Sequence, residues 1–172
     1  MIIKAEMKHI PAIAAIYEAV HDREEAGMST IGWIRGIYPT RATAEAAYRR
    51  EDLYVQTDGE RVVGAAVINQ IQPEAYAVGN WTCPAEAHEV LVLHTLVIDP
   101  AYAGHGYGRA FVQYYECLAR EQGMRVLRID TNARNLTARG MYAHLGYHEA
   151  GIVPCEFNGI PDVSLVLLEK VL

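Results

Sequence analysis

Three glycines alternate with larger residues near the middle of the chain, at Gly104, Gly106 and Gly108, and Arg109 follows them directly. Without a side chain, glycine lets the backbone approach a ligand closely and lets successive N–H groups point the same way. The pattern separates a strongly β-prone run from an amphipathic stretch that is typical of a helix. Because the amides at a helix N-terminus are unpaired and the dipole there is positive, the spacing predicts an anion site, best suited to phosphate.

The local sequence favours an external anion at this helix start. No Ser, Thr, Asp or Asn occurs between Gly104 and Arg109 to cap the helix. Arg109 would lie in the first turn, where a cation is normally unfavourable. A bound anion accounts for both features. The alternative is a tight turn whose amides are capped by water.

Two common phosphate-binding motifs match the loop poorly. A P-loop ends in Gly-Lys-Ser/Thr, whereas Gly108 is followed by Arg109 and Ala110. A Rossmann fingerprint places GxGxxG directly after a strand, whereas Arg109 takes the third glycine position and five residues separate strand from loop. Asp130 ends the next predicted strand and could act as the ribose-binding acid. A dinucleotide-binding oxidoreductase therefore stays open as an alternative.

The loop and a second segment together resemble the GNAT superfamily of N-acetyltransferases. Pro100-Ala-Tyr-Ala-Gly-His-Gly-Tyr-Gly108 is similar to the family's acetyl-CoA loop, which reads Gln/Arg-x-x-Gly-x-Gly/Ala after a strand. The segment from Asn135 to Tyr147 is similar to the family's helix, which reads Asn-x-x-Ala-x-x-x-Tyr-x-x-x-Gly-Phe/Tyr. The two matches follow the family's order and cover about residues 89–150. The family's Gln/Arg falls on Ala103, which has no side-chain donor.

The resemblance implies that acetyl-CoA binds along the central strand and the glycine loop. In the family the central strand opens at a bulge, which maps onto Leu96, Val97 and Ile98. The Leu96 amide is then the candidate for polarising the thioester carbonyl. The expected contacts to acetyl-CoA come from the loop and the following helix: Ala103, Gly104, His105, Gly106, Tyr107, Gly108, Arg109, Asn135 and Tyr142.

Tyr142 is the expected acid that protonates the leaving thiolate, a role that the resemblance implies. Spacings of three and four residues place Asn135, Ala138 and Tyr142 on one helix face. A phenol can donate to a thiolate at modest cost when it is well positioned. The alternative is a core tyrosine whose hydroxyl is satisfied elsewhere.

A base must remove a proton from the acceptor amine before it attacks. His94 precedes the expected bulge and its imidazole titrates near neutrality, so it could act directly or through water. Glu89 is the second choice. A structural strand histidine and a purely water-mediated route are the alternatives.

The acceptor pocket should come from loops rich in aromatic and polar residues. An aromatic and acidic lining would suit a cationic or amphipathic amine. The aromatic residues could equally belong to the core or to a dimer surface. Cys155 could lie near the acyl end, although a buried inert thiol is the simpler interpretation. The candidate substrate-binding residues are Trp33, Tyr38, Asn69, Asn80, Trp81 and Glu89.

The composition narrows the partners. The 172 residues carry a formal net charge of −6 and no long Lys/Arg run, which argues against a nucleic-acid partner. No apolar stretch approaches the roughly 20 residues of a membrane helix, and the N-terminus lacks signal-peptide features, so a cytoplasmic protein is expected. No metal is expected, because His88 and His94 would lie about 20 Å apart along one strand and the three cysteines form no CxxC.

The predicted elements alternate between strands and helices, with irregular segments at residues 28–42 and 72–87. Strands are expected at Ile2–Ala5, Leu53–Val55, Val62–Ile71, Glu89–Ile98, Val126–Asp130, Gly146–Val153 and Val163–Leu168. Helices are expected at His9–Glu25, Thr43–Arg50, Tyr107–Gln122 and Asn135–His144, with Thr43 as an N-cap. This order predicts an α/β (α+β) fold of GNAT type. One domain over residues 1–172 would hold a mixed, mostly antiparallel sheet of six to seven strands with four flanking helices.

Taken together, the residues and the resemblance predict an acetyl-CoA-dependent N-acetyltransferase. The acetyl group would pass directly to a primary amine, small or peptidic, within a ternary complex. No acyl-enzyme is expected, because no Ser/Cys–His arrangement is visible. A non-catalytic acyl-CoA-binding module is the main alternative. Dimers are common in the family, which leaves a homodimer open.

Overall fold

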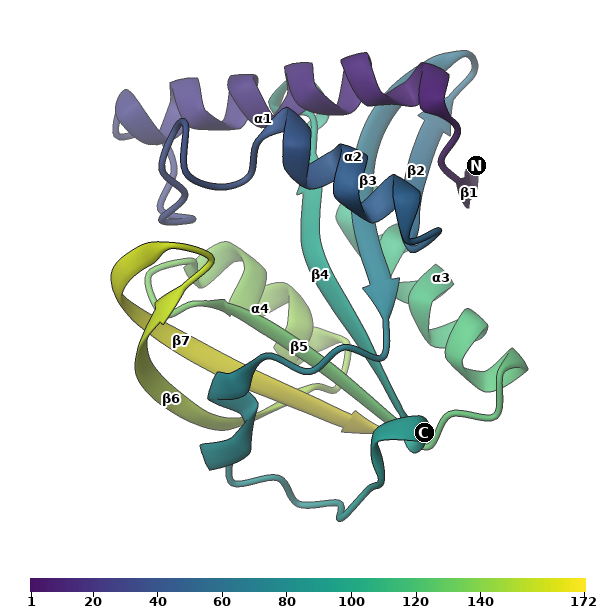
Figure 1. Ribbon diagram of the computed structural model, residues 1–172, viewed down its shortest axis with the longest axis vertical. Coiled ribbons are helices and arrows are strands. Elements are labelled where there is room, and N and C mark those ends of the chain that lie inside the picture. The colour runs from purple at the N-terminus through teal and green to yellow at the C-terminus, as the bar shows by residue number, and fades with distance from the viewer.

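A computed structural model describes residues 1–172, and its centre is one seven-stranded sheet (Figure 1). The strand order is β1-β2-β3-β4-β5-β7-β6, and every neighbouring pair is antiparallel except the parallel pair β4–β5. The strands are β1 (Ile2–Lys4), β2 (Leu53–Asp58), β3 (Arg61–Asn69), β4 (Val90–Ile98), β5 (Val126–Asn132), β6 (His148–Phe157) and β7 (Ile160–Val171). The expected mixed, mostly antiparallel sheet is confirmed.

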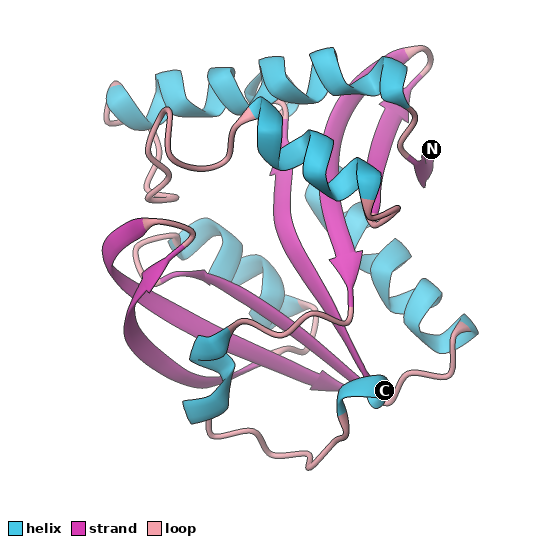
Figure 2. Ribbon diagram, viewed as in Figure 1, coloured by secondary structure: helices cyan, strands magenta, loops and turns pink.

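Four α-helices and four short 3₁₀ helices connect the strands (Figure 2). They are α1 (Ile10–Glu25), α2 (Arg41–Arg49), α3 (Tyr107–Glu121), α4 (Leu136–His144), η1 (Met7–His9), η2 (Glu74–Val78), η3 (Ala87–Glu89) and η4 (Pro100–Tyr102). No helix combines the length and the apolar composition that crossing a membrane requires.

Helices cover both faces of the sheet. Ile13 of α1 belongs to a buried cluster with residues of β2, β3 and β4, whereas Phe111 of α3 belongs to a cluster that includes Leu93 and Ile129. Alternate residues of a strand point to opposite faces, so β4 contributes to both layers. A third cluster packs Tyr76 and the segment around it against β5 and β7. The central strands are therefore packed on both faces of the sheet.

Several element boundaries differ from those predicted. Helix α2 begins at Arg41, because Thr40 is its N-cap. The Thr40 hydroxyl accepts a hydrogen bond from the Thr43 backbone amide, and the Thr43 hydroxyl accepts one from the Thr40 backbone amide. Thr43 is thus the N3 residue of a capping box, and its prediction as N-cap is wrong. Strands β6 and β7 are longer than predicted because they pair as one hairpin around Asn158 and Gly159.

Strands β4 and β5 pair only along part of their length. Their parallel register runs from Val90–Val126 to Leu93–Ile129 and stops there. Beyond this point the partner of β4 on the β5 side is missing, and the two strands diverge (Figure 1). The opening lies at the carboxyl ends of parallel strands, where open α/β sheets commonly bind ligands.

Candidate active site

A bulge in β4 lies at this opening. On the β3 side, Val67 pairs with His94 and Ala65 pairs with Val97, so Ala66 alone opposes Thr95 and Leu96. Thr95 has a φ of 51°, a left-handed conformation that is rare for a β-branched residue. The Tyr38 hydroxyl hydrogen bonds to the Thr95 hydroxyl. The bulge leaves Leu96 and Ile98 on a strand edge that β5 does not cover.

The glycine loop follows β4 and opens α3. Gly104 and Gly106 have φ of 80° and 81°, and a Cβ added at either would contact nothing. Gly106 is the N-cap of α3 without any side-chain cap. No backbone amide from Gly104 to Arg109 donates a hydrogen bond within the protein. The loop therefore presents a row of free donors at a helix N-terminus, as an anion site requires.

The other loop residues support this backbone rather than closing it. Gly108 packs closely, because an added Cβ would lie 3.4 Å from Met141 Sδ. His105 Nδ1 bonds to the Tyr102 and Ala103 carbonyls, and the Tyr107 hydroxyl donates to Asp58. Ala103 is exposed and offers no donor from its side chain.

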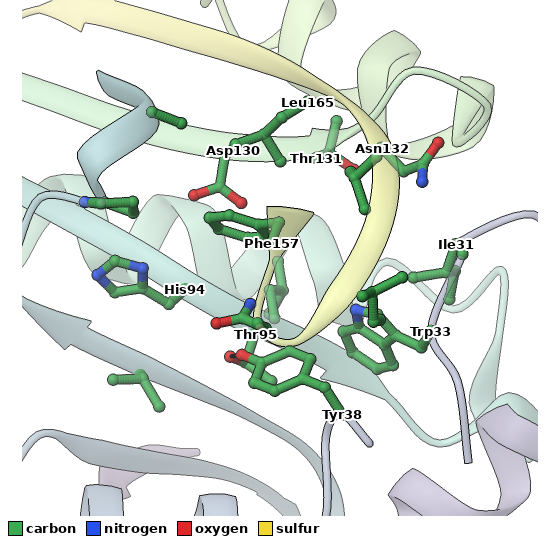
Figure 3. Close-up of a pocket in the computed structure, with 18 of the residues that line it drawn as sticks. Ile31, Trp33, Tyr38, His94, Thr95, Asp130, Thr131, Asn132, Phe157 and Leu165 are labelled. Carbon is green, nitrogen blue, oxygen red and sulfur yellow. Dashed lines mark hydrogen bonds between the residues drawn. The ribbon is translucent and has the colours of Figure 1, made fainter. Parts of the chain in front are cut away.

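A cavity of about 950 Å³ lies between the diverging ends of β4 and β5. Its walls include residues of β4, β5, α4 and the β6–β7 hairpin, together with the segment between α1 and α2. Figure 3 shows His94 and Thr95 on one side and Asp130, Thr131 and Asn132 on the other. The cavity therefore touches the unpaired edge of β4.

Asp130 is the acidic residue that the cavity places beside β4. Its carboxylate accepts one hydrogen bond, from the Tyr76 hydroxyl at 2.9 Å, and pairs with no cation. Burial raises the pKa of Asp130 to about 7, against a lowering effect of the Tyr76 hydrogen bond. A carboxylate with a pKa near the working pH is well suited to act as a general base. The sequence signalled only its position at a strand end, and we did not predict this role.

Tyr142 and Asn135 enter the same cavity from α4. Tyr142 is 4% exposed, and its hydroxyl makes no hydrogen bond to another protein group. Burial raises the pKa of Tyr142 well above its usual value, with a further contribution from the nearby Asp130 charge. Asn135 is the N-cap of α4: its Oδ1 accepts from the Ala138 amide at 3.2 Å, and its Nδ2 donates to Thr131. Tyr142 is thus kept protonated, while Asn135 is largely committed to its helix.

His94 lines the cavity, but its ring is tied to β3. Nε2 lies 3.0 Å from Asn69 Oδ1. Burial lowers the pKa of His94 to about 4, partly offset by the Asp52 charge. The imidazole is therefore neutral at pH 7 and a weaker base than Asp130.

The predicted acceptor-site residues divide into two groups. Trp33, Tyr38 and Asn69 line the cavity together with Cys155 and Phe157. Trp33 and Tyr38 come from the segment between α1 and α2, and Asn69 comes from the end of β3.

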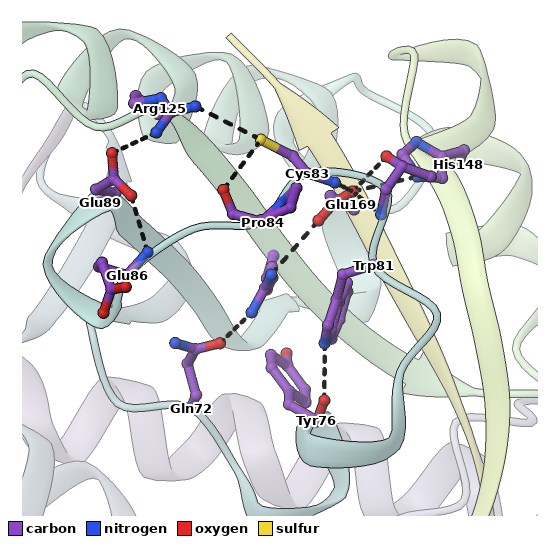
Figure 4. Close-up of polar contacts among 12 residues, drawn as sticks. Gln72, Tyr76, Trp81, Cys83, Pro84, Glu86, Glu89, Arg125, His148 and Glu169 are labelled. Carbon is purple, nitrogen blue, oxygen red and sulfur yellow. Dashed lines mark hydrogen bonds and ion pairs between the residues drawn. The ribbon is translucent and has the colours of Figure 1, made fainter.

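Asn80, Trp81 and Glu89 do not reach the cavity, which corrects their predicted place. The segment from 70 to 89 crosses the face of β5 and β7 instead (Figure 4). The Arg128 guanidinium lies over the Trp81 ring, 4.0 Å from its centroid. The Asn80 backbone amide donates to the Ala150 carbonyl. Glu89 pairs with Arg125 at the start of β4, roughly 16 Å along the strand from His94.

The Glu24 carboxylate binds several groups of the segment between α1 and α2. Glu24 accepts from the amides of Ile31 and Gly32 at 2.9 and 2.8 Å, and from the Ser29 hydroxyl. Its Oε1 also pairs with Arg134 at 3.2 Å. Sequence periodicity places Glu24 on α1 but cannot indicate these partners.

The cavity holds no group of three or more His, Cys, Asp or Glu side chains arranged for a metal ion, and neither does the rest of the chain. The arrangement instead offers free amides for phosphate, an open strand edge, a carboxylate of raised pKa and a protonated phenol. This set is suited to acyl transfer from a phosphate-bearing thioester.

Comparison with solved structures finds the same fold elsewhere. A GNAT-family acetyltransferase from Streptococcus agalactiae superposes with a TM-score of 0.82, is 22% identical, and is matched over 100% of this chain and 95% of its own. The similarity at this identity concerns the fold.

Two curated relatives match in sequence. An uncharacterized N-acetyltransferase of Methanocaldococcus jannaschii is 30% identical over 74 residues, 43% of this chain and 33% of that protein, so the match spans about a third of the relative. The [ribosomal protein bS18]-alanine N-acetyltransferase of Escherichia coli is 24% identical over 115 residues, 67% of this chain and 74% of that enzyme.

The model of the acetyltransferase (GNAT) family matches residues 15–147, which is most of the chain and includes β4, the glycine loop and Tyr142. The chain belongs to the acetyltransferase (GNAT) family.

Proposed function

We propose that this protein transfers the acetyl group of acetyl-CoA directly to a primary amine. The observation that carries the proposal is the cavity between β4 and β5, which brings Asp130 and Tyr142 beside an unpaired strand edge. Family membership supports the same chemistry. The transfer takes place in a ternary complex, without an acyl-enzyme.

The residues present fit acetyl-CoA. The free amides from Gly104 to Arg109 hold the pyrophosphate, and the exposed Arg109, which has no ion-pair partner, adds positive charge. These donors replace the side chain that Ala103 lacks. The open edge of β4 at Leu96, Val97 and Ile98 pairs with the pantetheine arm, and the Leu96 amide polarises the thioester carbonyl.

Asp130 and Tyr142 divide the proton transfers between them. The cationic acceptor first gives one proton to solvent and reacts as the neutral amine. Asp130 then takes one further proton from the amine nitrogen as that nitrogen bonds to the thioester carbonyl carbon. When the carbon–sulfur bond breaks, Tyr142 gives one proton to the sulfur. In the transfer itself one proton has left nitrogen and one has reached sulfur, and exchange through solvent returns both residues to their starting states. Positioning by the cavity lowers the barrier to each transfer.

The lining of the cavity favours a cationic acceptor. Asp130, Glu74 and Glu156 contribute carboxylates, whereas the lining cation Arg50 is paired with Asp52 at 2.9 Å. Trp33 and Tyr38 contribute aromatic surface. The similarity to an enzyme that acetylates an alanine of ribosomal protein bS18 makes a peptide α-amine the first acceptor to test.

The test combines ligand binding and transfer. Acetyl-CoA, CoA and NAD are titrated separately in a thermal-shift assay. A hundredfold excess over Kd adds about 2.7 kcal/mol to the stability of the native state. A peptide with N-terminal alanine and spermidine are then incubated with acetyl-CoA, and mass spectrometry detects a gain of one acetyl group. The same peptide with a blocked N-terminus is the control.

The outcomes separate the alternatives. A shift with acetyl-CoA but not NAD, followed by acetylation of an unblocked amine, supports the proposal. Binding of acetyl-CoA without transfer to any amine would instead indicate a non-catalytic acyl-CoA-binding module. A shift with NAD alone would contradict the proposal.

A further inference from the structure

Tyr76 connects the cavity to a segment outside it. It lies in η2, within the stretch that crosses the face of β5 and β7, and it is 3% exposed. Its hydroxyl donates to Asp130 Oδ2 at 2.9 Å. No other group of the protein hydrogen bonds to that carboxylate. The orientation of Asp130 therefore depends on a residue 54 positions earlier in the chain.

Trp81 holds the backbone of Tyr76 (Figure 4). The indole Nε1 donates to the Tyr76 carbonyl at 2.7 Å, and the two rings lie 5.2 Å apart. The indole also contacts Arg128, whose guanidinium lies 4.0 Å from the ring centroid. Arg128 and Asp130 are two apart on β5 and so project from the same face of the strand. The turn that carries Tyr76 is thus anchored on the strand that carries Asp130.

A buried ion pair fixes the rest of the segment. Arg128 Nη2 lies 3.5 Å from Glu169 Oε1, and their side chains are 7% and 0% exposed. The other Glu169 oxygen accepts from the Thr82 amide, the Thr82 hydroxyl and the Cys83 amide at 2.9, 2.7 and 3.2 Å. A buried pair of this kind contributes little net stability, and its best-supported use is to specify one arrangement. Here that arrangement holds the segment in register on the sheet.

We propose that Tyr76 is the positioning residue of the catalytic base Asp130. Trp81 and the Arg128–Glu169 pair hold the segment that carries Tyr76 and so fix the direction of its hydroxyl. This inference rests on the proposed function. Tyr76 does not touch the reacting atoms; it fixes the direction of the carboxylate and stabilises its charged form by a charge-assisted hydrogen bond.

Arg128, on the same face of β5, is paired with Glu169, and the other titratable groups around the Asp130 carboxylate carry no positive charge at neutral pH. Tyr142 approaches from α4, Tyr38 from the segment between α1 and α2, and Cys155 from β6, and each lies near enough to interact with the Asp130 charge. His94 faces the cavity from β4 in its neutral form. Because the Tyr76 hydrogen bond lowers the pKa of Asp130, its loss must raise that pKa.

The experiment follows the ionisation of Asp130 directly. Protein with ¹³C-labelled aspartate carboxyls is titrated by NMR as wild type and as Tyr76→Phe, with the Asp130 signal identified by its absence in Asp130→Asn. The midpoint should move upward by about one pH unit, the size expected for one lost charge-assisted hydrogen bond. The acid limb of kcat/KM for an acceptor peptide should move by the same amount, since the acceptor is unchanged.

Tyr115→Phe is the matched control. Its hydroxyl is also buried, and it donates to the Leu91 and Arg128 carbonyls rather than to Asp130. This variant should lose stability while both the Asp130 midpoint and the acid limb stay in place. If Tyr76→Phe does not fold, Trp81→Phe decides, since it removes the indole donor but keeps the Tyr76 hydroxyl. A smaller upward movement supports the proposal.

An unmoved Asp130 midpoint in the folded Tyr76→Phe protein would overturn the inference, as would equal movement in Tyr115→Phe. The NMR titration needs no acceptor. Absence of acetyl transfer in the wild type would therefore refute the proposed function separately, while the midpoint still decides whether Tyr76 controls Asp130.

Discussion

His94 Nε2 lies 3.0 Å from Asn69 Oδ1, across the pair formed by β3 and β4. The same Asn69 oxygen accepts from the Ile71 amide, and Asn69 Nδ2 donates to Asp52. These contacts fix the amide orientation, so Nε2 must be the protonated nitrogen of a neutral imidazole. The relationship makes His94 part of the wall that supports β4, and it directs attention to Asp130 as the base.

Replacing Asp130 should lower kcat more than replacing His94, the other candidate base. Asp130→Asn should lower kcat by about 10²- to 10⁴-fold, the range expected for a general base, while His94→Asn should lower kcat by less than about tenfold. Steady-state kinetics with one acceptor measures both, and calorimetric titration should show acetyl-CoA affinity near wild type. A larger loss in the His94 variant would reverse the assignment.

The raised pKa of Asp130 predicts how activity depends on pH. The base must be ionised, so kcat/KM for the acceptor should fall tenfold per pH unit below about pH 7. Asp130→Asn should abolish this limb in its residual activity. A wild-type limb near pH 4 would instead match His94, whose pKa is about 4. Rates measured from pH 5 to 9 in buffers of constant ionic strength distinguish the two.

The same pKa predicts a stability change of defined sign. The native carboxyl titrates near 7 and the unfolded one near 3.9. Between these values the native state binds more protons, so the free energy of unfolding falls as pH rises through this window. Asp130→Asn removes that cost, and its Tm should exceed the wild-type Tm at pH 8 and converge with it near pH 4. Asp162→Asn, at an exposed site outside the cavity, is the control.

The role of the glycine loop in binding can be tested against a glycine elsewhere whose backbone is also left-handed. Gly106 has φ of 81° and Gly27 has φ of 70°, and an added Cβ contacts nothing at either site. Alanine should destabilise each by about 1 kcal/mol through its left-handed backbone. Only Gly106→Ala should also weaken acetyl-CoA binding, by about tenfold or more, because its loop carries the free amides. Equal Kd values for the two variants would argue against a pyrophosphate site.

Tyr142→Phe should separate chemistry from binding. Loss of the acid should lower kcat by about 100-fold and leave the Kd for CoA unchanged. Tyr147→Phe is the matched control: its ring packs on Tyr142 at 5.9 Å, but it does not line the cavity. Wild-type turnover in Tyr142→Phe would show that another group protonates the thiolate.

Glu24→Gln should affect the acceptor more than the acyl donor. Its charge holds two backbone amides, Ser29 and Arg134, so its loss should loosen the segment that carries Trp33 and Tyr38. We expect KM for the acceptor to rise several-fold while KM for acetyl-CoA changes little. Glu18→Gln on the same helix is the control, because Arg35 keeps its bonds to Asp22 and Glu25.

The order of elements and the anion loop could be predicted from the sequence alone. Hydrophobic periodicity and turn residues are local, so the seven strands and four helices could be predicted with only their ends displaced. Three alternating glycines without a capping residue predicted the free amides at the start of α3, because helix capping depends on neighbours in the chain. Tyr142 was identified through the resemblance of its segment to the GNAT helix motif, and its spacing from Asn135 predicted that the two share one helix face.

Which residues share the cavity depends on contacts that form only when the chain folds. The roles inferred for Asp130, Tyr76 and Glu24 depend on partners far away in sequence. For the same reason, Trp81 and Glu89 lie outside the cavity that they were predicted to line. The raised pKa of Asp130 results from its burial in the folded protein, and no sequence pattern encodes a local dielectric. Side-chain chemistry is local, whereas burial and orientation are properties of the assembled fold.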